Sequence, residues 1–222
     1  MIERLTVGPI GENAYVLPLD GGAGLPREGG PCVLVDPGDE AERILDFLDS
    51  RRLVPSLVVA THGHLDHVGA LPSLMAAFAA RGRALLLAVH RADAAYFGER
   101  GEETNRRVFQ AIRAMGYFKS YWKTMPEAGL LLEDGALLPG STWRVIHTPG
   151  HTAGSICLYD EARGVLVSGD TLFRDGVGRT DGPDSDPAAL EASLKERLFL
   201  LPVDTRVFPG HGEPTTIGRE RG

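Results

Sequence analysis

The chain has 222 residues, of which 43% are hydrophobic and 24% charged, and its formal net charge is −7 at pH 7. This length and composition are ordinary for one soluble globular domain, residues 1–222, with a substantial core. The negative charge argues against a general nucleic-acid or membrane-surface binder, because phosphate groups demand clustered positive charge. No apolar run is long enough to cross a bilayer, so we expect no membrane partner.

Three apolar runs bounded by turn residues predict short strands near the amino terminus: residues 2–7, 14–19 and 31–35. The glycine-rich residues 20–30 predict a surface loop. The amino terminus has no basic run followed by a long apolar one, so we expect no secretory signal and a cytoplasmic protein. Cys32 and Cys157 lie in apolar, strand-like runs, and we expect buried free thiols, which suit a reducing cytoplasm.

The next segment alternates helices with strands. Asp39 is the predicted N-cap of a helix with an apolar stripe, and Glu42 is its capping-box partner. A strand at residues 57–60, an amphipathic helix over residues 68–78 and a strand at residues 84–89 follow. This alternation is typical of an α/β domain, and neither a repeat nor a linker divides the chain.

A cluster of potential metal ligands follows the strand at residues 57–60. Three histidines and one aspartate fall within six positions there: His62, His64, Asp66 and His67. Neutral imidazole and carboxylate oxygen are common ligands of divalent transition metals. The spacing lets His62 and His64 reach one ion from an extended segment, whereas Asp66 and His67 point elsewhere and suggest a second ion. A purely structural role for these side chains is the alternative.

Residues 104–126 form a basic and aromatic segment without any carboxylate. Its apolar positions keep helical spacing, so one interpretation is a helix that packs on the core while its charges stay solvated. The other interpretation is a lid or substrate wall whose cations hold an anionic group of the substrate. The candidate substrate-binding residues, one of them from a later loop, are Arg106, Arg107, Lys119, Tyr121, Lys123 and Arg179.

Three later strands are predicted, each followed by a ligand-type side chain that a glycine directly precedes. The strands lie at residues 143–146, 165–167 and 206–208, and the side chains are His151, Asp170 and His211. Glycine permits the close backbone approach that a crowded ion site requires. Asp186 and the following proline predict the start of a last long helix. For His90 and His147 we expect packing, capping or supporting roles.

Together these motifs resemble the signature series of the metallo-β-lactamase superfamily. The matching stretches are T-H-G-H-L-D-H, T-P-G-H-T-A-G-S, S-G-D-T-L-F and F-P-G-H-G, in that order along nearly the whole chain. Within the superfamily, G-R-T-D at residues 178–181 and P-G-H-G-E-P-T-T-I-G at residues 209–218 are similar to the glyoxalase II (hydroxyacylglutathione hydrolase) branch. The resemblance implies an α/β fold, a four-layered αβ/βα sandwich of two mixed sheets with helices outside.

The resemblance also implies a set of ligands, carried over position by position. One ion falls to His62, His64 and His151, the second to Asp66, His67 and His211, and Asp170 bridges both. Zinc suits imidazole and carboxylate ligands, and iron or manganese would too. The expected cofactors are therefore two divalent metal ions.

The chemistry expected of such a site is metal-assisted hydrolysis of a small-molecule thioester such as S-lactoylglutathione. A water bridging two ions loses a proton near neutral pH and becomes the nucleophile. Asp66 could orient that hydroxide, which makes Asp66 and Asp170 the candidate catalytic residues. Glyoxalase II enzymes carry a further helical region that binds glutathione, and little of this chain follows Gly218. Either residues 104–126 substitute for that region, or the substrate is not a glutathione thioester.

Other functions stay open at this point. A persulfide dioxygenase would use a single iron at His62, His151 and Asp170. A β-lactamase is disfavoured by the bridging Asp170, and a nuclease by the acidic balance of the chain. A non-enzymatic metal-binding module would fill its coordination spheres with protein ligands, whereas the ligands implied here leave positions open. The oligomeric state is not predicted.

Overall fold

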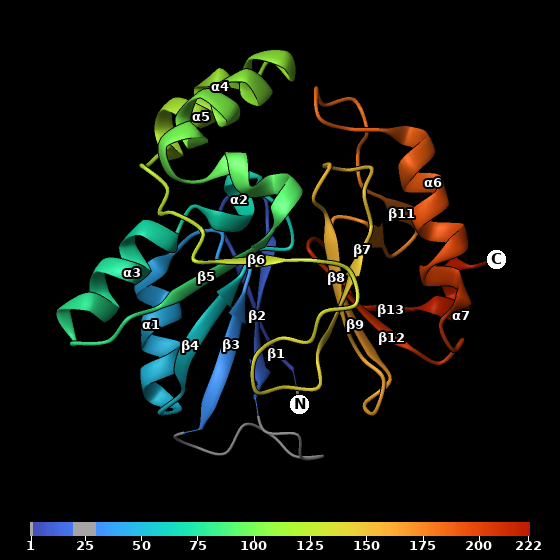
Figure 1. The fold of residues 1–222 in the computed structure, drawn as a ribbon, viewed down its shortest axis with the longest axis horizontal. Coiled ribbons are helices and arrows are strands. Elements are labelled where there is room, and N and C mark those ends of the chain that lie inside the picture. The colour runs from blue at the N-terminus through green and yellow to red at the C-terminus, as the bar shows by residue number, and fades with distance from the viewer. Residues whose placement is uncertain (1, 20–29) are drawn as a thin grey trace.

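The structure, a computed structural model, describes residues 2–19 and 30–222. Two β-sheets face each other, and helices cover the outer face of each sheet (Figure 1). This arrangement is the predicted αβ/βα sandwich. The surface loop predicted at residues 20–30 lies almost wholly outside the described residues.

The first sheet comes from the amino-terminal part of the chain. Among the described residues its order is β1-β2-β3-β4-β5-β6. Its strands are β1 (Glu3–Val7), β2 (Glu12–Pro18), β3 (Pro31–Val35), β4 (Val54–Val59), β5 (Leu86–His90) and β6 (Leu130–Leu132). Strands β3 to β6 are parallel to one another, so their carboxyl ends meet at one edge of the sheet.

The second sheet has the order β13-β12-β9-β8-β7 in the part of the chain that the structure describes. Its strands are β7 (Arg144–His147), β8 (Ile156–Asp160), β9 (Val165–Gly169), β12 (Arg206–Pro209) and β13 (Thr215–Thr216), and a separate hairpin pairs β10 (Leu172–Phe173) with β11 (Gly176–Val177). Strands β7 and β9 are both antiparallel to β8, and β12 is parallel to β9. Strands β7, β9 and β12 therefore end at the same edge.

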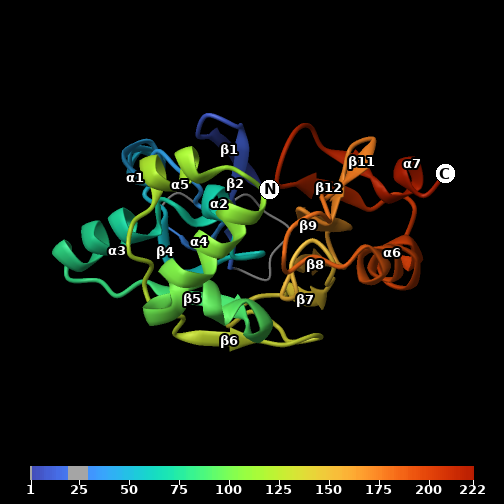
Figure 2. The same ribbon diagram turned by 90° about the horizontal axis from the view of Figure 1, so that it is seen from above.

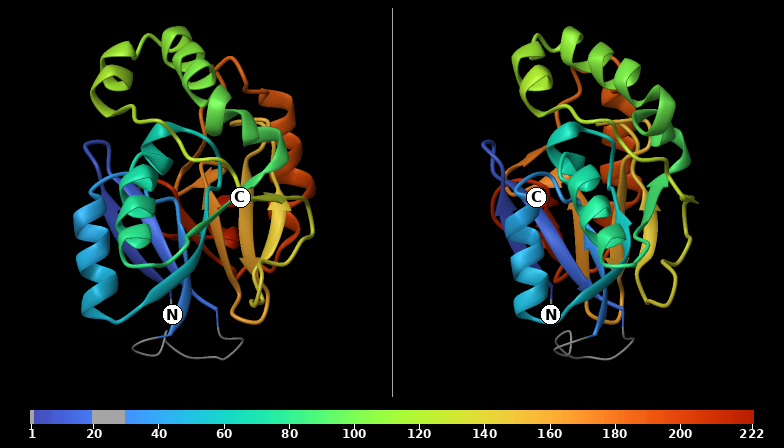
Figure 3. Two further views of the ribbon diagram at one scale, coloured as in Figure 1. Left: turned by 60° about the vertical axis from the view of Figure 1, so that its left-hand side comes forward. Right: turned by 90° about the vertical axis from the view of Figure 1, so that its left-hand side faces the viewer.

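Two pairs of helices form the outer layers. Helices α1 (Ala41–Ser50) and α3 (Leu71–Ala80) cover the first sheet, as the side views show (Figure 3). Helices α6 (Pro187–Glu196) and α7 (Ile217–Glu220) cover the second. Among the described residues, no helix combines the length and apolar character needed to span a membrane.

Three further helices lie at the edge where the parallel strands end. They are α2 (Leu65–Val68), α4 (Gly101–Ala111) and α5 (Met115–Tyr121), and α4 and α5 lie above the strand ends (Figures 1 and 2). Short 3₁₀ segments, η1 (Arg91–Tyr96) and η2 (Gly98–Arg100), lead from β5 into α4, and η3 (Leu198–Leu200) follows α6.

Strand alternation produces the layers. In β3, Val33 and Val35 face the second sheet, in a core shared with Trp143, whereas Cys32 and Leu34 face the helices. Both faces are buried, as the continuous apolar run of this parallel strand predicts. Cys32 and Cys157 are buried free thiols, which confirms the prediction, and burial raises their pKa values to about 12 and about 11.

The predicted cap of the first helix is wrong. Helix α1 starts at Ala41, and Glu40 before it has a positive φ of 52° and no side-chain cap. The Asp39 carboxylate instead accepts a hydrogen bond from the Glu40 N–H, because the left-handed residue moves Asp39 away from the first turn. At α6, by contrast, Asp186 accepts hydrogen bonds from the N–H groups of Ala188 and Ala189, as an N-cap should.

Candidate metal centre

All the predicted metal ligands lie where strands of the two sheets end. Strand β4 runs into the segment that carries His62 and His64, and β9 into Asp170. Strand β12 leads to His211, and the loop after β7 carries His151. The Ile156 N–H donates to the Thr61 carbonyl at 2.9 Å, and this hydrogen bond joins the two sheets beside the cluster.

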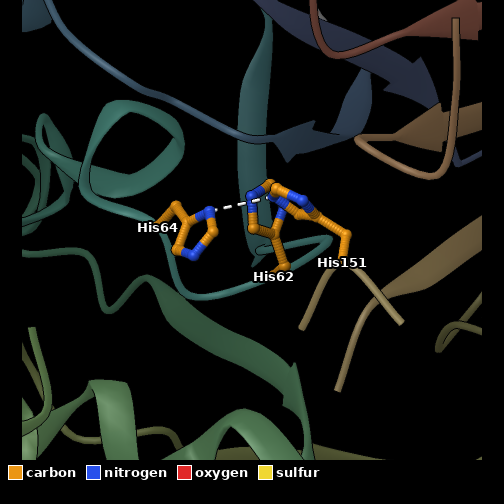
Figure 4. A group of neighbouring side chains, drawn as sticks. All are labelled: His62, His64 and His151. Carbon is orange, nitrogen blue, oxygen red and sulfur yellow. Dashed lines mark hydrogen bonds between the residues drawn. The ribbon is translucent and has the colours of Figure 1, made fainter. Parts of the chain in front are cut away.

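The first predicted set forms a triplet of imidazoles. His62, His64 and His151 each offer a ring nitrogen, and these nitrogens lie within 4.8 Å of one another (Figure 4). His64 Nδ1 and His151 Nε2 are 2.9 Å apart. Such convergence suits three ligands of one cation.

The second predicted set is equally close. Ligand atoms of Asp66, His67 and His211 lie within 4.8 Å of one another, and Asp66 Oδ2 is 3.2 Å from His211 Nε2. Asp66 and His67 lie in α2, which begins directly after His64. The chain changes from extended to helical there, so adjacent parts of one motif face different triplets.

Asp170 lies between the triplets. Its Oδ2 is 3.6 Å from His151 Nε2 in the first set, and its Oδ1 is 3.3 Å from His67 Nε2 in the second. Two glycines allow this packing. A Cβ at Gly210 would lie 2.3 Å from Asp170 Oδ1, and one at Gly169, whose φ is +48°, would lie 2.4 Å from Thr61 Oγ1. Any larger residue would collide at either position.

Hydrogen bonds behind the ligands orient their rings. Thr61 Oγ1 donates to Asp36 at 2.5 Å and accepts from His62 Nδ1 at 3.2 Å, which leaves the lone pair on His62 Nε2. His151 Nδ1 donates to the Arg179 carbonyl at 2.8 Å, with the same result. Carboxylate or carbonyl partners of this kind are typical behind metal-binding histidines.

Asp93 connects the two loops that carry the first triplet. This buried carboxylate accepts hydrogen bonds from Gly63 N–H at 3.0 Å, Thr152 Oγ1 at 2.8 Å and Gly154 N–H at 2.6 Å. Gly63 separates His62 from His64, and Thr152 follows His151. One side chain from η1 therefore holds both loops in place.

Several buried atoms at the centre have no hydrogen-bond partner, among them His62 Nε2, His67 Nε2 and Asp170 Oδ1. Leaving such atoms unpaired is costly, and cations bound at the two triplets would satisfy them. Burial and the neighbouring His151 lower the pKa of His64 to about 3, which keeps its imidazole neutral. Burial opposes ionisation of Asp170, but His67 holds its pKa below the usual value. The donor set therefore fits divalent transition metals.

A cavity of about 330 Å³ opens over this centre. Its floor consists of the ligands His64, Asp66, His151, Asp170 and His211. Its roof, from α4, α5 and the turn between them, consists of Val108, Phe109, Ile112, Ala114 and Tyr117. Arg179, Gly182 and Ser185 form a side wall, and Ile10 also lines the cavity.

Of the six predicted substrate-binding residues, the structure brings Arg179 to the cavity. The other five lie elsewhere. Arg106 pairs with Glu102, Arg107 with Asp184, and Lys123 donates to Ser73, while Lys119 is exposed and Tyr121 stacks on Tyr117 with ring centroids 4.4 Å apart. The reason is that α4 and α5 turn their apolar side chains toward the core and the cavity, and their cations toward solvent.

The two remaining histidines have the supporting roles expected. His90 accepts a hydrogen bond from Ala92 N–H, as the N-cap of η1, and stacks on His147 at 3.9 Å. His147 Nε2 donates to the Ala153 carbonyl. Neither belongs to the ligand triplets found among the described residues.

Sequence reasoning missed three buried acids around the centre. Asp36 directly follows β3, so the strand-end pattern could have found it. Glu12 lies 3.8 Å from His67 Nδ1, and burial raises its pKa well above the ordinary value. Neither Glu12 nor Asp93 has such a signal, since their places depend on contacts with distant segments.

Comparisons with known proteins agree with this fold. The sequence model of the metallo-beta-lactamase superfamily matches residues 18–211. The protein of Haemophilus influenzae named hydroxyacylglutathione hydrolase GloC is 34% identical over 190 residues, which cover 86% of this chain and 84% of that protein.

Two solved structures are similar over almost their whole length. The crystal structure of BLEG-1 B3 metallo-beta-lactamase has a TM-score of 0.82 and 32% identity, and the match covers 99% of this chain and 96% of that one. TTHA1623, solved in a di-iron-bound form, has a TM-score of 0.75 and 36% identity, with the same coverage.

Proposed function

This chain belongs to the metallo-beta-lactamase superfamily, as a metal-dependent hydrolase, and from that premise we propose that it cleaves thioesters with two divalent cations. One observation carries the proposal: two triplets of ligand-type side chains have Asp170 between them, and members of both triplets line the floor of a cavity. The similarity to GloC, which is named for the hydrolysis of hydroxyacylglutathione, supports a thioester as the substrate.

The residues that would hold the cations are the predicted ones: His62, His64 and His151 for the first, Asp66, His67 and His211 for the second, and Asp170 for both. Bound divalent cations supply Lewis acidity toward a carbonyl oxygen and lower the pKa of water. The ligands suit zinc, iron or manganese. The di-iron form of TTHA1623 supports iron as the bound metal, and the ligand chemistry supports zinc.

The chain's own side chains prepare the attack on the substrate. Asp66 lines the cavity, and its carboxylate can accept a hydrogen bond from the attacking water. A thiolate leaves without protonation, so a thioester requires no protein acid on the leaving-group side. Both cysteines are buried and unreactive, and we propose no acyl-enzyme.

The test combines metal analysis with three assays on freshly purified protein. We expect about two metal ions per chain and hydrolysis of S-lactoylglutathione or a related thioester, with loss of activity on chelation and recovery on adding metal back. Nitrocefin turnover in place of thioester hydrolysis would instead assign the β-lactamase activity for which BLEG-1 is named. If the protein contains one iron per chain and consumes oxygen when a persulfide is added, its activity is that of a persulfide dioxygenase.

A further inference from the structure

The roof of the cavity is largely apolar, with the hydroxyl of Tyr117 as its polar side-chain group, although the segment that builds it is rich in cations. Val108 and Ile112 are one helical turn apart and face the same way, beside Phe109. Arg113 then takes a left-handed conformation, with φ of 58°, and this turn brings Ala114 and Tyr117 to the same surface. The roof thus comes from consecutive parts of one basic segment.

The cations of this segment are directed away from the cavity. Arg106 and Arg107 are on the exposed side of α4 and pair with Glu102 and Asp184. Arg179 is the cation that lines the cavity, and its guanidinium makes two hydrogen bonds with Asp181. A charged group of a substrate would therefore find no partner on the part of the roof that Val108, Phe109 and Ile112 form, and its burial there would be unfavourable.

A thioester has two arms, one on each side of the reacting carbonyl. When that carbonyl lies at the floor, the cavity offers one apolar surface, the roof, and one more polar surface, the side wall of Arg179, Gly182 and Ser185. Carrier thiols built on cysteine or cysteamine have amide groups within a few bonds of the sulfur, so they suit the polar wall. The acyl arm then has to lie under the roof.

We infer, on the basis of the proposed thioester hydrolysis, that the roof selects substrates whose acyl group is apolar, aliphatic or aromatic, over hydroxyacyl groups such as lactoyl. A hydroxyl group placed against Val108, Phe109 and Ile112 would lose its hydrogen bonds to water and gain none. An aliphatic group there gains from burial, and each methylene that enters raises kcat/KM about fourfold.

The test is a series of glutathione thioesters with a constant thiol arm and a varied acyl group: lactoyl, acetyl, butanoyl, 3-methylbutanoyl and phenylacetyl. For the metal-loaded protein we expect kcat/KM to rise from acetyl to 3-methylbutanoyl by about tenfold or more and to exceed the value for lactoyl. If the thioesters are hydrolysed with equal kcat/KM values, or with lactoyl as the best substrate, this inference is overturned and the proposed function stays intact. If none of these thioesters is cleaved, both fail.

A pair of adjacent substitutions separates the roof from the rest of α4. Ile112→Ser places a hydroxyl in the roof, whereas Ala111→Ser places the same group on the exposed side of the helix. We expect Ile112→Ser to lower the ratio of kcat/KM for 3-methylbutanoyl over acetyl about tenfold, and Ala111→Ser to leave it unchanged. An equal loss for both substrates would indicate a merely structural role and contradict the inference.

A binding measurement removes the dependence on catalysis. S-hexylglutathione and S-methylglutathione are uncleaved thioethers that differ in their apolar arm, and calorimetry can compare them on the metal-free protein. We expect S-hexylglutathione to bind at least tenfold more tightly, with a more negative heat-capacity change. This difference should shrink in Ile112→Ser and persist in Ala111→Ser. Equal binding of the two thioethers by the unmodified chain would place the apolar arm outside the cavity.

Discussion

The floor and the roof of the cavity are built in opposite ways. The floor gathers side chains from separate strand ends of both sheets, whereas the roof comes from the single segment α4–α5. Beneath and within the floor, buried atoms such as His62 Nε2 and Asp170 Oδ1 lack hydrogen-bond partners. The roof side chains instead pack against one another, with the rings of Phe109 and Tyr117 stacked at a centroid distance of 5.8 Å. In the two proposals made above, the floor carries the chemistry and the roof the selection of substrate.

This difference separates two kinds of change. Altering the floor removes a ligand from a cluster whose members depend on one another, so the effect should fall on metal content and turnover together. Altering the roof changes the contact area offered to a substrate, and the centre should stay intact. Similar proteins are named for different activities, a hydroxyacylglutathione hydrolase and a β-lactamase, and this is consistent with a substrate choice that the shared fold does not set.

The largest effect is expected at Asp170. Replacing Asp170 with alanine removes the carboxylate between the triplets and leaves His67 and His151 facing each other without it. We expect kcat to fall roughly a thousandfold and bound metal to be lost in parallel. Kinetics and elemental analysis of the same preparation measure both, and Asp204→Ala, an exposed aspartate, is the control. Retention of metal and turnover would refute the assignment of Asp170.

A smaller effect is expected at Asp93, which supports the floor from behind. Asp93→Ala leaves the Gly63 and Gly154 N–H groups without their acceptor, which should lower the free energy of unfolding by about 2 kcal/mol or more. Because the two loops that carry the first triplet lose the hydrogen bonds that Asp93 accepts from them, metal affinity should fall roughly 10- to 100-fold. Metal titration and thermal melting measure these changes against Asp46→Ala, an exposed control. Unchanged affinity despite lower stability would show that Asp93 does not position the ligands.

A roof substitution should affect stability and selectivity but spare the centre. Phe109→Ala removes a buried ring that packs on Tyr117 and Phe118, so we expect a loss of about 3 kcal/mol in unfolding free energy. Metal content should stay unchanged, and kcat/KM for an acetyl thioester should stay within about threefold of the original value. Denaturant titration and metal analysis check these expectations. Loss of metal in this variant would mean that floor and roof are not independent.

The smallest effect is expected on the exposed side of the roof segment. Reversing both charges in Lys119→Glu with Lys123→Glu changes residues that do not line the cavity, so KM for an anionic thioester should change less than about twofold. Steady-state kinetics at low ionic strength is the most sensitive measurement. A severalfold rise in KM would restore the interpretation in which the cations of residues 104–126 hold the substrate.

Local patterns account for what could be predicted. Apolar runs ending in His62, Asp170 or His211 indicated both the strands and the edge at which they meet, because parallel strands present their carboxyl ends together. The cap at Asp39 failed because the positive φ of Glu40, next to it, is not visible in residue types. The role of the basic residues 104–126 was ambiguous for a similar reason. Helical spacing shows that a helix has an apolar face, but it does not show whether that face packs on the core or lines a cavity.

Residue patterns by themselves determined an α/β domain with ligand-type side chains after several of its strands, since strand length, turn chemistry and ligand spacing are written in neighbouring residues. The αβ/βα sandwich and the division of the ligands into two sets came from the resemblance of the motifs to the superfamily. Only the tertiary structure showed that Asp36 and Asp93 form hydrogen bonds behind these side chains and that Glu12 lies beside His67. It also showed that α4 and α5 present a largely apolar roof to the cavity. These features depend on contacts between segments far apart in the chain, where geometry and burial, and not residue type, select the partner.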